Sequence, residues 1–353
     1  MREIYPLMDA CFERDASDLH LSVGRPPVLR MRGGLQELDG PPLTAEEIEA
    51  MVGQITPERN AAELQQVGTT DFGYAHGDKC RFRVAVLTQK GARGIVMRLI
   101  PHKLLLLEQI GLPESVRALL QLHRGLILVT GPTGSGKTTT LATMVDWINR
   151  NRDVHIVTIE DPIEYYHSHQ MAQITQREVG TDVPTFAEAM RRVLRQDPDV
   201  VLLGEMRDLE TTSAAISAAE TGHLVFGTLH TTGAARTVDR IIDQYPTDQQ
   251  EQIRSQLAVA LVAVISQILV PTADGRGRVA AFEVMITNPA IENHIRKCET
   301  YKIPSVIQTS RRAGMSLLDD SLLELYRSGR ITREVMLERC FDRKALEQRA
   351  GGV

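Results

Sequence analysis

The alternation of apolar and polar residues changes character near residue 100. Before that point, Ile4, Met8 and Cys11 recur at helical spacing at the start of the chain, which predicts an amphipathic helix. Short runs of alternating apolar and polar residues follow, separated by turns rich in glycine and proline, as in half-buried strands. The pattern predicts a small α+β domain over residues 1–100.

Two local signals define the second half of that domain. Thr44 and Glu47 have the spacing of a capping box, in which each side chain accepts a hydrogen bond from the other residue's backbone, so a helix is expected to begin there. Residues 81–87 and 94–100 are strand candidates, and residues 88–93 are predicted to join them as a hairpin connection.

From residue 114 onward, short apolar runs alternate with helical segments. The runs are rich in β-branched or large apolar residues, which is typical of parallel strands covered by helices on both faces. They are residues 126–130, 156–159, 200–203 and 224–228. Residues 114–353 are therefore predicted to form an α/β domain with a mainly parallel sheet.

The remaining segments are assigned by composition. Residues 101–113 include four consecutive leucines, so they are predicted to be an inter-domain connector that packs rather than a flexible linker. The chain is expected to be mainly helical from about residue 290, with its clearest amphipathic helix at residues 316–328. Residues 343–353 end in Gly-Gly-Val and are expected to fray.

Composition narrows the class of protein. The chain has 353 residues, of which 42% are hydrophobic and 24% charged, as expected for a globular protein of two domains. Its formal net charge is −5 and only 4% of its residues are aromatic. Proteins that hold nucleic acid usually need a basic groove and stacking aromatics, so no nucleic-acid partner is expected.

The cysteines and the apolar segments indicate in which cellular compartment the protein is expected. Cys11, Cys80, Cys298 and Cys340 are far apart in sequence, so they are predicted to be reduced thiols rather than disulfides or a zinc site. The N-terminus has no apolar signal segment, and the longest apolar stretch, residues 257–270, is too short to span a bilayer. A cytoplasmic protein without direct membrane insertion is expected.

The strongest chemical signal is a phosphate-binding loop that follows the first apolar run. The segment fits the G-x-x-x-x-G-K-[ST] pattern, in which backbone N–H groups surround phosphates, Lys137 reaches the β- and γ-phosphates and the Thr138 hydroxyl ligates Mg²⁺. No guanine-reading N-K-x-D loop occurs, so ATP is the expected nucleotide. The residues predicted to bind it are Gly131, Pro132, Thr133, Gly134, Ser135, Gly136, Lys137, Thr138 and Thr139.

Acidic residues follow two of the predicted strands. Glu205 ends a run that resembles a Walker B strand, with Gly204 at the position of the usual aspartate. It is predicted to be the general base that activates water; the alternative is a strand cap that pairs with Arg207. Glu160, Asp161 and Glu164 follow another strand, at the sheet edge where ligands bind. At least one of them is expected to hold the metal's water shell or the attacking water, with Glu160 the first candidate; the alternative for each is an anchor of the loop before Pro162.

Histidines and arginines complete the list of candidates. His223 and His230 flank one predicted strand, and His230 in particular is placed to sense the γ-phosphate, although either histidine could be structural. Arg83 and Arg98 lie in the last strands of the first domain. Their residue type suits arginine fingers, but the spacing alone fits exposed arginines of a hairpin equally well.

These motifs together resemble the secretion ATPase superfamily of type II secretion and type IV pili. The Walker A, Asp box, atypical Walker B and His box motifs of that superfamily correspond in order to residues 131–140, 160–165, 195–208 and 220–231. Ser17-Asp18-Leu19-His20-Leu21, and the segment from Ala290 to Arg296, are similar to the type IV pilus retraction branch, the PilT-like family.

The resemblance implies an architecture and a function. It implies a PAS-like first domain, a RecA-like second domain, a homo-hexameric ring with ATP and Mg²⁺ at the interfaces, and Arg83 and Arg98 reaching the nucleotide. The expected activity is ATP hydrolysis that powers pilus retraction, as in twitching motility. The expected partner is an inner-membrane pilus platform protein, with the ring at the inner face of the cytoplasmic membrane.

Two departures leave alternatives open. The family's C-terminal motif has an arginine and a leucine where this chain has Glu292 and His294, which is compatible with an accessory or regulatory ATP-binding paralogue. A RecA-like nucleic-acid translocase is the other alternative. The tetracysteine segment of the related assembly ATPases does not occur, which favours retraction over assembly.

Overall fold

The computed structural model describes residues 3–31, 33–77, 79–100 and 104–351. Contacts divide it into two units: the described part of residues 1–103 together with Pro162–Tyr166, and residues 104–161 together with the described part of 167–353. Residues 101–103 of the expected connector lie outside the described residues, and residues 104–113 belong to the second unit.

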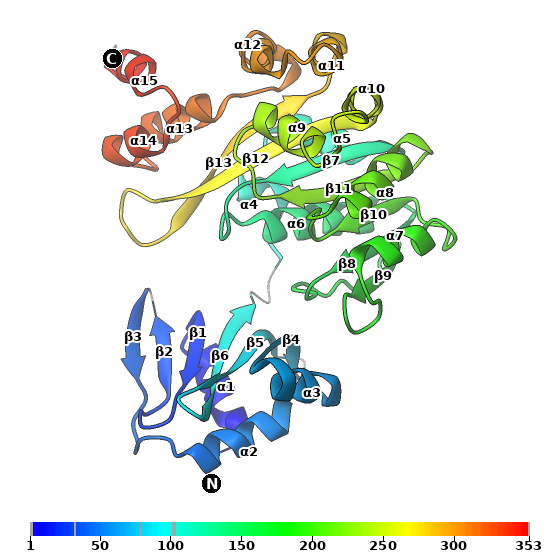
Figure 1. The fold of residues 1–353 in the computed structure, drawn as a ribbon. Coiled ribbons are helices and arrows are strands. Elements are labelled where there is room, and N and C mark those ends of the chain that lie inside the picture. The colour runs from blue at the N-terminus through cyan, green and yellow to red at the C-terminus, as the bar shows by residue number, and fades with distance from the viewer. Residues whose placement is uncertain (1–2, 32, 78, 101–103, 352–353) are drawn as a thin grey trace. The chain divides into compact units, whose positions relative to one another are not determined.

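The first unit is built on an antiparallel sheet. Among its described residues the strand order is β3-β2-β1-β6-β5-β4 (Figure 1). The capping box predicted at Thr44 is present and begins the second helix. The elements are α1 (Ile4–Glu13), β1 (Asp18–Leu21), β2 (Val28–Met31), β3 (Gly34–Glu37), α2 (Ala45–Ile55), α3 (Glu58–Val67), β4 (Thr69–His76), β5 (Cys80–Gln89) and β6 (Ala92–Ile100).

The two faces of this sheet differ in polarity because strand side chains alternate. One face carries apolar side chains such as Leu19, Phe82 and Met97, which are buried in one core with Met8 of α1 and Met51 of α2. The opposite face carries a row of charged side chains that runs across four strands. In the strand register, the row consists of Arg30 on β2, Asp18 on β1, Arg98 on β6 and Arg83 on β5.

The second unit has a mainly parallel sheet of order β13-β12-β7-β11-β10-β8-β9 among the described residues. All neighbouring strands are parallel except β12 and β13. Its strands and their helices are α4 (Leu107–Ile110), α5 (Glu114–Leu119), β7 (Gly125–Thr130), α6 (Lys137–Asn151), β8 (His155–Glu160), β9 (Gln173–Glu178), α7 (Phe186–Val193), β10 (Val200–Leu203), α8 (Leu209–Glu220), β11 (Leu224–Leu229), α9 (Ala234–Ile242), α10 (Gln250–Ala260), β12 (Leu261–Pro271) and β13 (Arg278–Ile286).

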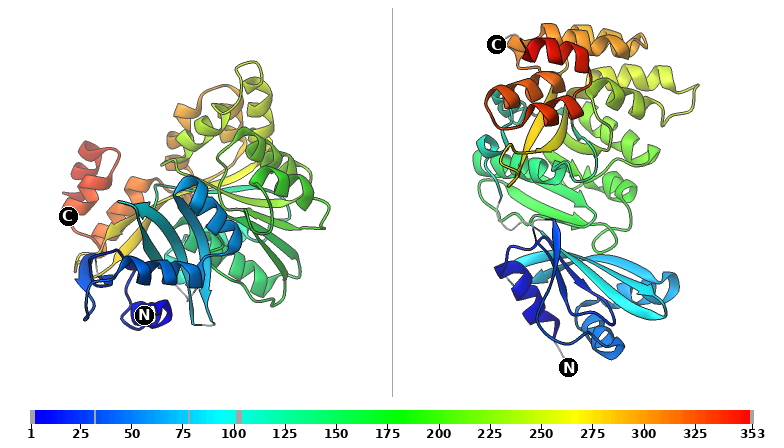
Figure 2. Two further views of the ribbon diagram at one scale, coloured as in Figure 1. Left: turned by 60° about the horizontal axis from the view of Figure 1, so that its bottom comes forward. Right: turned by 90° about the vertical axis from the view of Figure 1, so that its left-hand side faces the viewer.

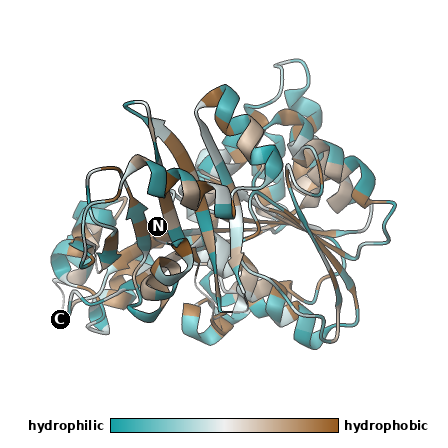
Figure 3. Ribbon diagram, turned by 90° about the horizontal axis from the view of Figure 1, so that it is seen from below, coloured by the Kyte–Doolittle hydropathy of each residue, from teal (hydrophilic) through white to brown (hydrophobic). Residues whose placement is uncertain are grey.

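Helices cover both faces of this sheet, as the apolar strands predicted (Figure 2). One core joins side chains of α5 and α6 to one face, and a second core joins α7 to α10 to the other. Figure 3 shows the strands coloured mainly as hydrophobic, with hydrophilic residues on the outer helix surfaces. The predicted fold class, a small α+β unit followed by an α/β unit with a mainly parallel sheet, is confirmed.

The C-terminal part is helical, with one correction to the expectation. It contains α11 (Pro289–Arg296), α12 (Ile303–Thr309), α13 (Leu318–Arg327), α14 (Arg333–Arg339) and α15 (Arg343–Ala350), with 3₁₀ turns at Thr300–Lys302 and Arg311–Ala313. The prediction that residues 343–353 fray is wrong for the described residues, which form α15. Asp342 caps this helix, and Leu346 is buried against the other C-terminal helices.

A buried carboxylate connects the sheet to two helices. Glu283 of β13 accepts a hydrogen bond from the backbone N–H of Ala234 at the start of α9 (2.7 Å), and the backbone of Leu318 at the start of α13 also hydrogen-bonds to it. Burial raises the pKa of Glu283, although these two hydrogen bonds act in the opposite direction. Within the described residues, no helix is long and apolar enough to cross a membrane.

Candidate active site

The phosphate-binding loop connects β7 to α6. Gly131, Gly134 and Gly136 have φ angles of 143°, 76° and 88°, a region that side chains with a Cβ rarely adopt. The glycines therefore allow the turn that directs backbone N–H groups inward, next to the positive end of α6. Lys137 begins α6, and its Nζ donates hydrogen bonds to the carbonyls of Gly131 (2.9 Å) and Pro132 (3.2 Å).

Glu205 lies beside this loop because β10 is two strands away from β7 in the same parallel sheet. One carboxylate oxygen lies 2.7 Å from an Arg207 guanidinium nitrogen, and the other 3.0 Å from Nε2 of His230. Burial alone would raise the pKa of Glu205, but the hydrogen bonds and charges of Arg207 and His230 outweigh it and lower that pKa. Glu205 is therefore ionised at neutral pH, as a general base must be.

His230 connects Glu205 to the phosphate-binding loop. Its other ring nitrogen, Nδ1, lies 3.5 Å from the Thr133 hydroxyl. His230 follows the carboxyl end of β11, whose last residue is paired with Thr130 in the strand register. The structure thus brings together Thr133, His230 and Glu205 at one edge of the sheet.

Glu160 ends β8 at the same edge, next to Gly204. The Thr158 hydroxyl donates a hydrogen bond of 2.6 Å to its carboxylate. A Cβ at position 204 would lie 3.3 Å from the Glu160 Cα atom, so glycine allows the ends of β8 and β10 to approach closely. Glu164 lies in the segment whose contacts belong to the first unit.

His223 is not brought to this edge. It precedes β11, and its carbonyl accepts a hydrogen bond from Gly125 at the amino end of β7. The length of these strands, about 17 Å, separates His223 from the phosphate-binding loop within one chain. Its Nδ1 lies 3.0 Å from the carbonyl of Ala218, the local contact expected of a structural histidine.

Arg83 and Arg98 lie opposite each other on β5 and β6 of the first unit. Arg98 Nε lies 3.0 Å from a carboxylate oxygen of Asp18, which is buried. Among the described residues, Arg83 forms no ion pair, and its side chain is exposed. Like charges directly opposite each other on neighbouring strands are unfavourable. Arg98 is compensated by Asp18, whereas the exposed Arg83 has no such ion pair among the described residues and remains available to an anion.

The segment Pro162–Tyr166 is the part of the first unit that is remote in sequence from the rest of it. The guanidinium of Arg81 lies over the Tyr166 ring, 4.2 Å from its centroid, within the range of a cation–π interaction. Within the first unit, Tyr166 thus contacts β5, the strand that also carries Arg83.

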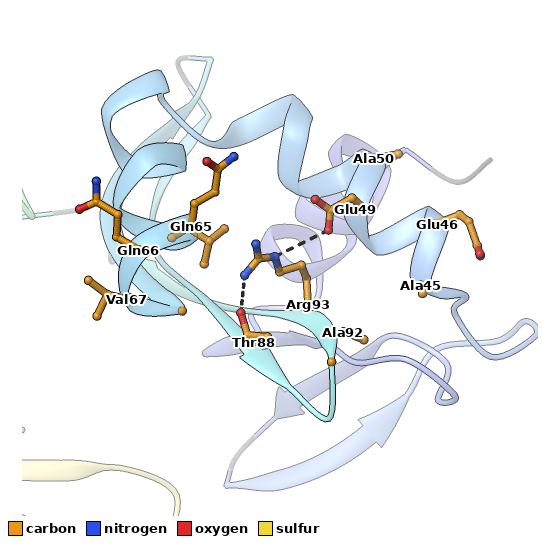
Figure 4. Close-up of a pocket in the computed structure, with 13 residues that line it drawn as sticks. Ala45, Glu46, Glu49, Ala50, Gln65, Gln66, Val67, Thr88, Ala92 and Arg93 are labelled. Carbon is orange, nitrogen blue, oxygen red and sulfur yellow. Dashed lines mark hydrogen bonds and ion pairs between the residues drawn. The ribbon is translucent and has the colours of Figure 1, made fainter.

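An open groove of about 1060 Å³ lies elsewhere in the first unit, between α2, α3 and the β5–β6 hairpin (Figure 4). Arg93 crosses it, with its Nε 3.8 Å from a carboxylate oxygen of Glu49 and a hydrogen bond to Thr88. None of the predicted site residues lines this groove.

Comparison with known proteins identifies the family. The model of the type II/IV secretion system protein family matches residues 62–336. The chain belongs to this family. It is 46% identical over 332 residues to the type IV pilus retraction ATPase PilT of Pseudomonas aeruginosa, covering 94% of this chain and 96% of that protein. The resemblance predicted from the motifs is confirmed.

Two further similarities support this assignment to the type II/IV secretion system proteins. A twitching motility protein of Neisseria gonorrhoeae is 46% identical over 313 residues, covering 89% of this chain and 84% of that protein. The crystal structure of the pilus retraction motor PilT with bound ADP has a TM-score of 0.91 and 43% identity, covering 99% of this chain and 100% of that one.

The two departures from this family's C-terminal motif have partners nearby in sequence, one within α11 and one just after it. Glu292 forms an ion pair with Arg296 one turn later (2.6 Å), and His294 Nδ1 lies 3.1 Å from a carboxylate oxygen of Glu299. Both substituted side chains are thus accommodated within the segment in which they occur.

Proposed function

We propose that this chain is the ATP-hydrolysing subunit of a homo-hexameric motor that powers type IV pilus retraction. The observation that carries the proposal is similarity to the pilus retraction motor PilT over 99% of the chain, together with the phosphate-binding loop, Glu205 and His230 at one sheet edge. ATP is the substrate. The force is applied to an inner-membrane pilus platform protein, at the cytoplasmic face of the membrane.

Each site residue except His223 has a role in hydrolysis. The loop from Gly131 to Thr139 and Lys137 bind the phosphates. Glu205 accepts the proton of the attacking water, for which it must be ionised, as its lowered pKa ensures at neutral pH. His230 orients Glu205 and reports on the γ-phosphate through its contact with Thr133. Glu160 positions water at the end of β8, and Glu164 is a second candidate for this role in the segment that follows. His223, at the opposite edge, is structural and takes no part in hydrolysis.

The residues present fit a magnesium ion with the nucleotide. Thr138 is partly exposed in the first turn of α6, beside the phosphate-binding loop. Glu160 and Glu205 lie at the carboxyl ends of the neighbouring strands β8 and β10, and their carboxylates would bond water ligands of the ion. When bound, Mg²⁺ neutralises charge that develops on the phosphates. The protein's part is to keep these oxygen atoms at the sheet edge.

Arg83 and Arg98 are proposed to reach the phosphates of a nucleotide when the ring closes. Residues 1–100 and 114–353 act as separate domains joined by residues 101–113, so closure moves the arginines relative to the loop. A guanidinium stabilises negative charge that develops during phosphoryl transfer. Hydrolysis is then linked to domain movement, which is what a motor requires.

The departures at Glu292 and His294 keep one second candidate, an accessory ATP-binding paralogue. Three measurements test both: steady-state ATP hydrolysis with and without single-stranded DNA, native mass, and restoration of twitching in a strain without its retraction ATPase. A hexamer that hydrolyses ATP independently of DNA and restores twitching alone supports the motor. A chain that restores twitching only beside another retraction ATPase is the paralogue, and hydrolysis that requires DNA would overturn both.

A further inference from the structure

A single amide side chain lies behind the phosphate-binding loop. Gln267 is in the middle of the mainly apolar strand β12, which pairs with β7, and it is only 1% exposed. Its neighbour Ser266 is in register with Thr130, the last residue of β7, so Gln267 comes level with Gly131, where the loop begins. A Cβ at Gly131 would lie 2.1 Å from the Gln267 carbonyl oxygen.

Both polar atoms of the Gln267 amide form hydrogen bonds. Nε2 donates a hydrogen bond of 2.5 Å to the carbonyl of Ser135 in the loop, and Oε1 accepts one of 2.8 Å from the hydroxyl of Thr140 in the first turn of α6. Ser135 and Thr140 are themselves buried. The amide therefore connects the loop to the helix that follows it, in a region without access to water.

The chemistry of these contacts requires an amide. The loop carbonyl needs a donor and the threonine hydroxyl needs an acceptor, and a glutamine side chain offers one of each. A carboxylate would face the Ser135 carbonyl without a proton to share. A Cβ at Gly136 would lie 3.0 Å from Nε2, so the second loop glycine provides the space that the amide occupies.

We propose that Gln267 is a positioning residue for nucleotide binding, which holds the phosphate-binding loop in its receptive conformation. Phosphates are bound by loop N–H groups, whose directions depend on the loop's conformation. A loop that is already ordered loses less entropy when the nucleotide binds, which increases affinity. This inference rests on the proposed nucleotide site, and Gln267 itself does not touch the substrate.

A purely structural role for Gln267 would give a different result. A buried amide could serve only to stabilise β12, as its apolar neighbour Ile265 does on the same face. Loss of either side chain would then lower the melting temperature, with no specific effect on nucleotide. Ile265→Ala is therefore the matched control for Gln267→Met, in which an apolar side chain of similar length removes both hydrogen bonds.

The test compares the full-length variants in ADP and ATP-analogue binding and in steady-state hydrolysis, well below their melting temperatures. Gln267→Met should weaken the affinity for both nucleotides by about ten-fold or more, because two hydrogen bonds are lost. It should raise KM with kcat little changed, since the loop binds the ground state and the transition state alike. Ile265→Ala should lower the melting temperature and leave affinity unchanged.

A double variant tests the connection between the loop and α6. If Gln267 acts through Thr140, Thr140→Val should weaken binding less than Gln267→Met, and the double variant should bind as Gln267→Met alone. Wild-type affinity in Gln267→Met, or equal loss in Ile265→Ala, would overturn the inference. Lys137→Ala distinguishes failure of the inference about Gln267 from failure of the proposed nucleotide site. If Lys137→Ala binds nucleotide as the wild type does, the proposed site itself is wrong.

Discussion

The replacement Glu205→Gln changes the chemistry of the site and little of its shape. The amide has the size of the carboxylate, and its oxygen can still accept the hydrogen bond from Arg207, 2.7 Å away. Its nitrogen takes the place of the oxygen that lies 3.0 Å from His230 Nε2, and this contact is retained if that ring nitrogen acts as acceptor. What the variant loses is the ability to take a proton from water.

The expected magnitudes separate catalysis from stability. Loss of a general base lowers kcat by about 10²- to 10⁴-fold, which corresponds to about 3–5 kcal/mol of transition-state stabilisation. The ion pairs that are lost involve side chains that are 69% exposed for Arg207 and 48% exposed for His230. Such pairs contribute about 1 kcal/mol or less, so the melting temperature should change little.

The measurements are steady-state ATP hydrolysis and equilibrium binding of a fluorescent ATP analogue. We expect Glu205→Gln to abolish turnover and to keep the affinity, because binding depends on the phosphate-binding loop. Glu160→Gln, at the end of the neighbouring strand, is the matched control and should lose less activity. Wild-type turnover in Glu205→Gln would refute the assignment and transfer the role of base to Glu160 or Glu164.

Three further predictions concern other parts of the chain. Arg83→Ala should lower kcat strongly, leave nucleotide affinity within about an order of magnitude and keep the melting temperature. Arg98→Ala should also lower the melting temperature, because Arg98 neutralises a buried carboxylate. A normal hydrolysis rate in Arg83→Ala would contradict the proposed role of these arginines. The pKa of Glu283 is raised above its ordinary value of 4.5. The wild type should therefore lose stability relative to Glu283→Gln as the pH rises from about 4.5 through the raised pKa. A difference in melting temperature that does not change with pH would contradict this prediction. Burial raises the pKa of Cys11 to about 12, so a thiol reagent near neutral pH should label exposed Cys298 first, as peptide mapping would show; early labelling of Cys11 would contradict its burial.

Local patterns predicted those elements whose signals lie within a few residues. The phosphate-binding loop, the capping box at Thr44 and the strands around the nucleotide site are of this kind. Residues 257–270 read as one apolar stretch, yet α10 ends at Ala260 and β12 begins at Leu261. Hydrophobicity is continuous across that boundary, so it does not show where the backbone changes conformation. In α15, the buried anchor is the isolated apolar Leu346, which a periodicity search does not detect.

The arrangement of the site depends on strand order, which the sequence does not state. His223 and His230 looked alike because both flank β11, but the strand directs them to opposite edges of the sheet. The contact between His230 and Glu205 follows from the adjacency of β10 and β11. Gln267 gives no local signal of its role, since its hydrogen-bond partners are more than 120 residues away in sequence.

Gly204 sets a limit on how this site could be redesigned. An engineer who restored the usual Walker B aspartate there would place its Cβ 3.3 Å from both the Ile159 carbonyl oxygen and the Glu160 Cα atom. These are backbone atoms of β8, so the strands would have to separate by a few tenths of an ångström. The extra side chain would thus move the end of β8, which carries Glu160, away from the end of β10. In this chain, an acid at position 204 and the close approach of β8 to β10 exclude each other, and glycine allows the close approach.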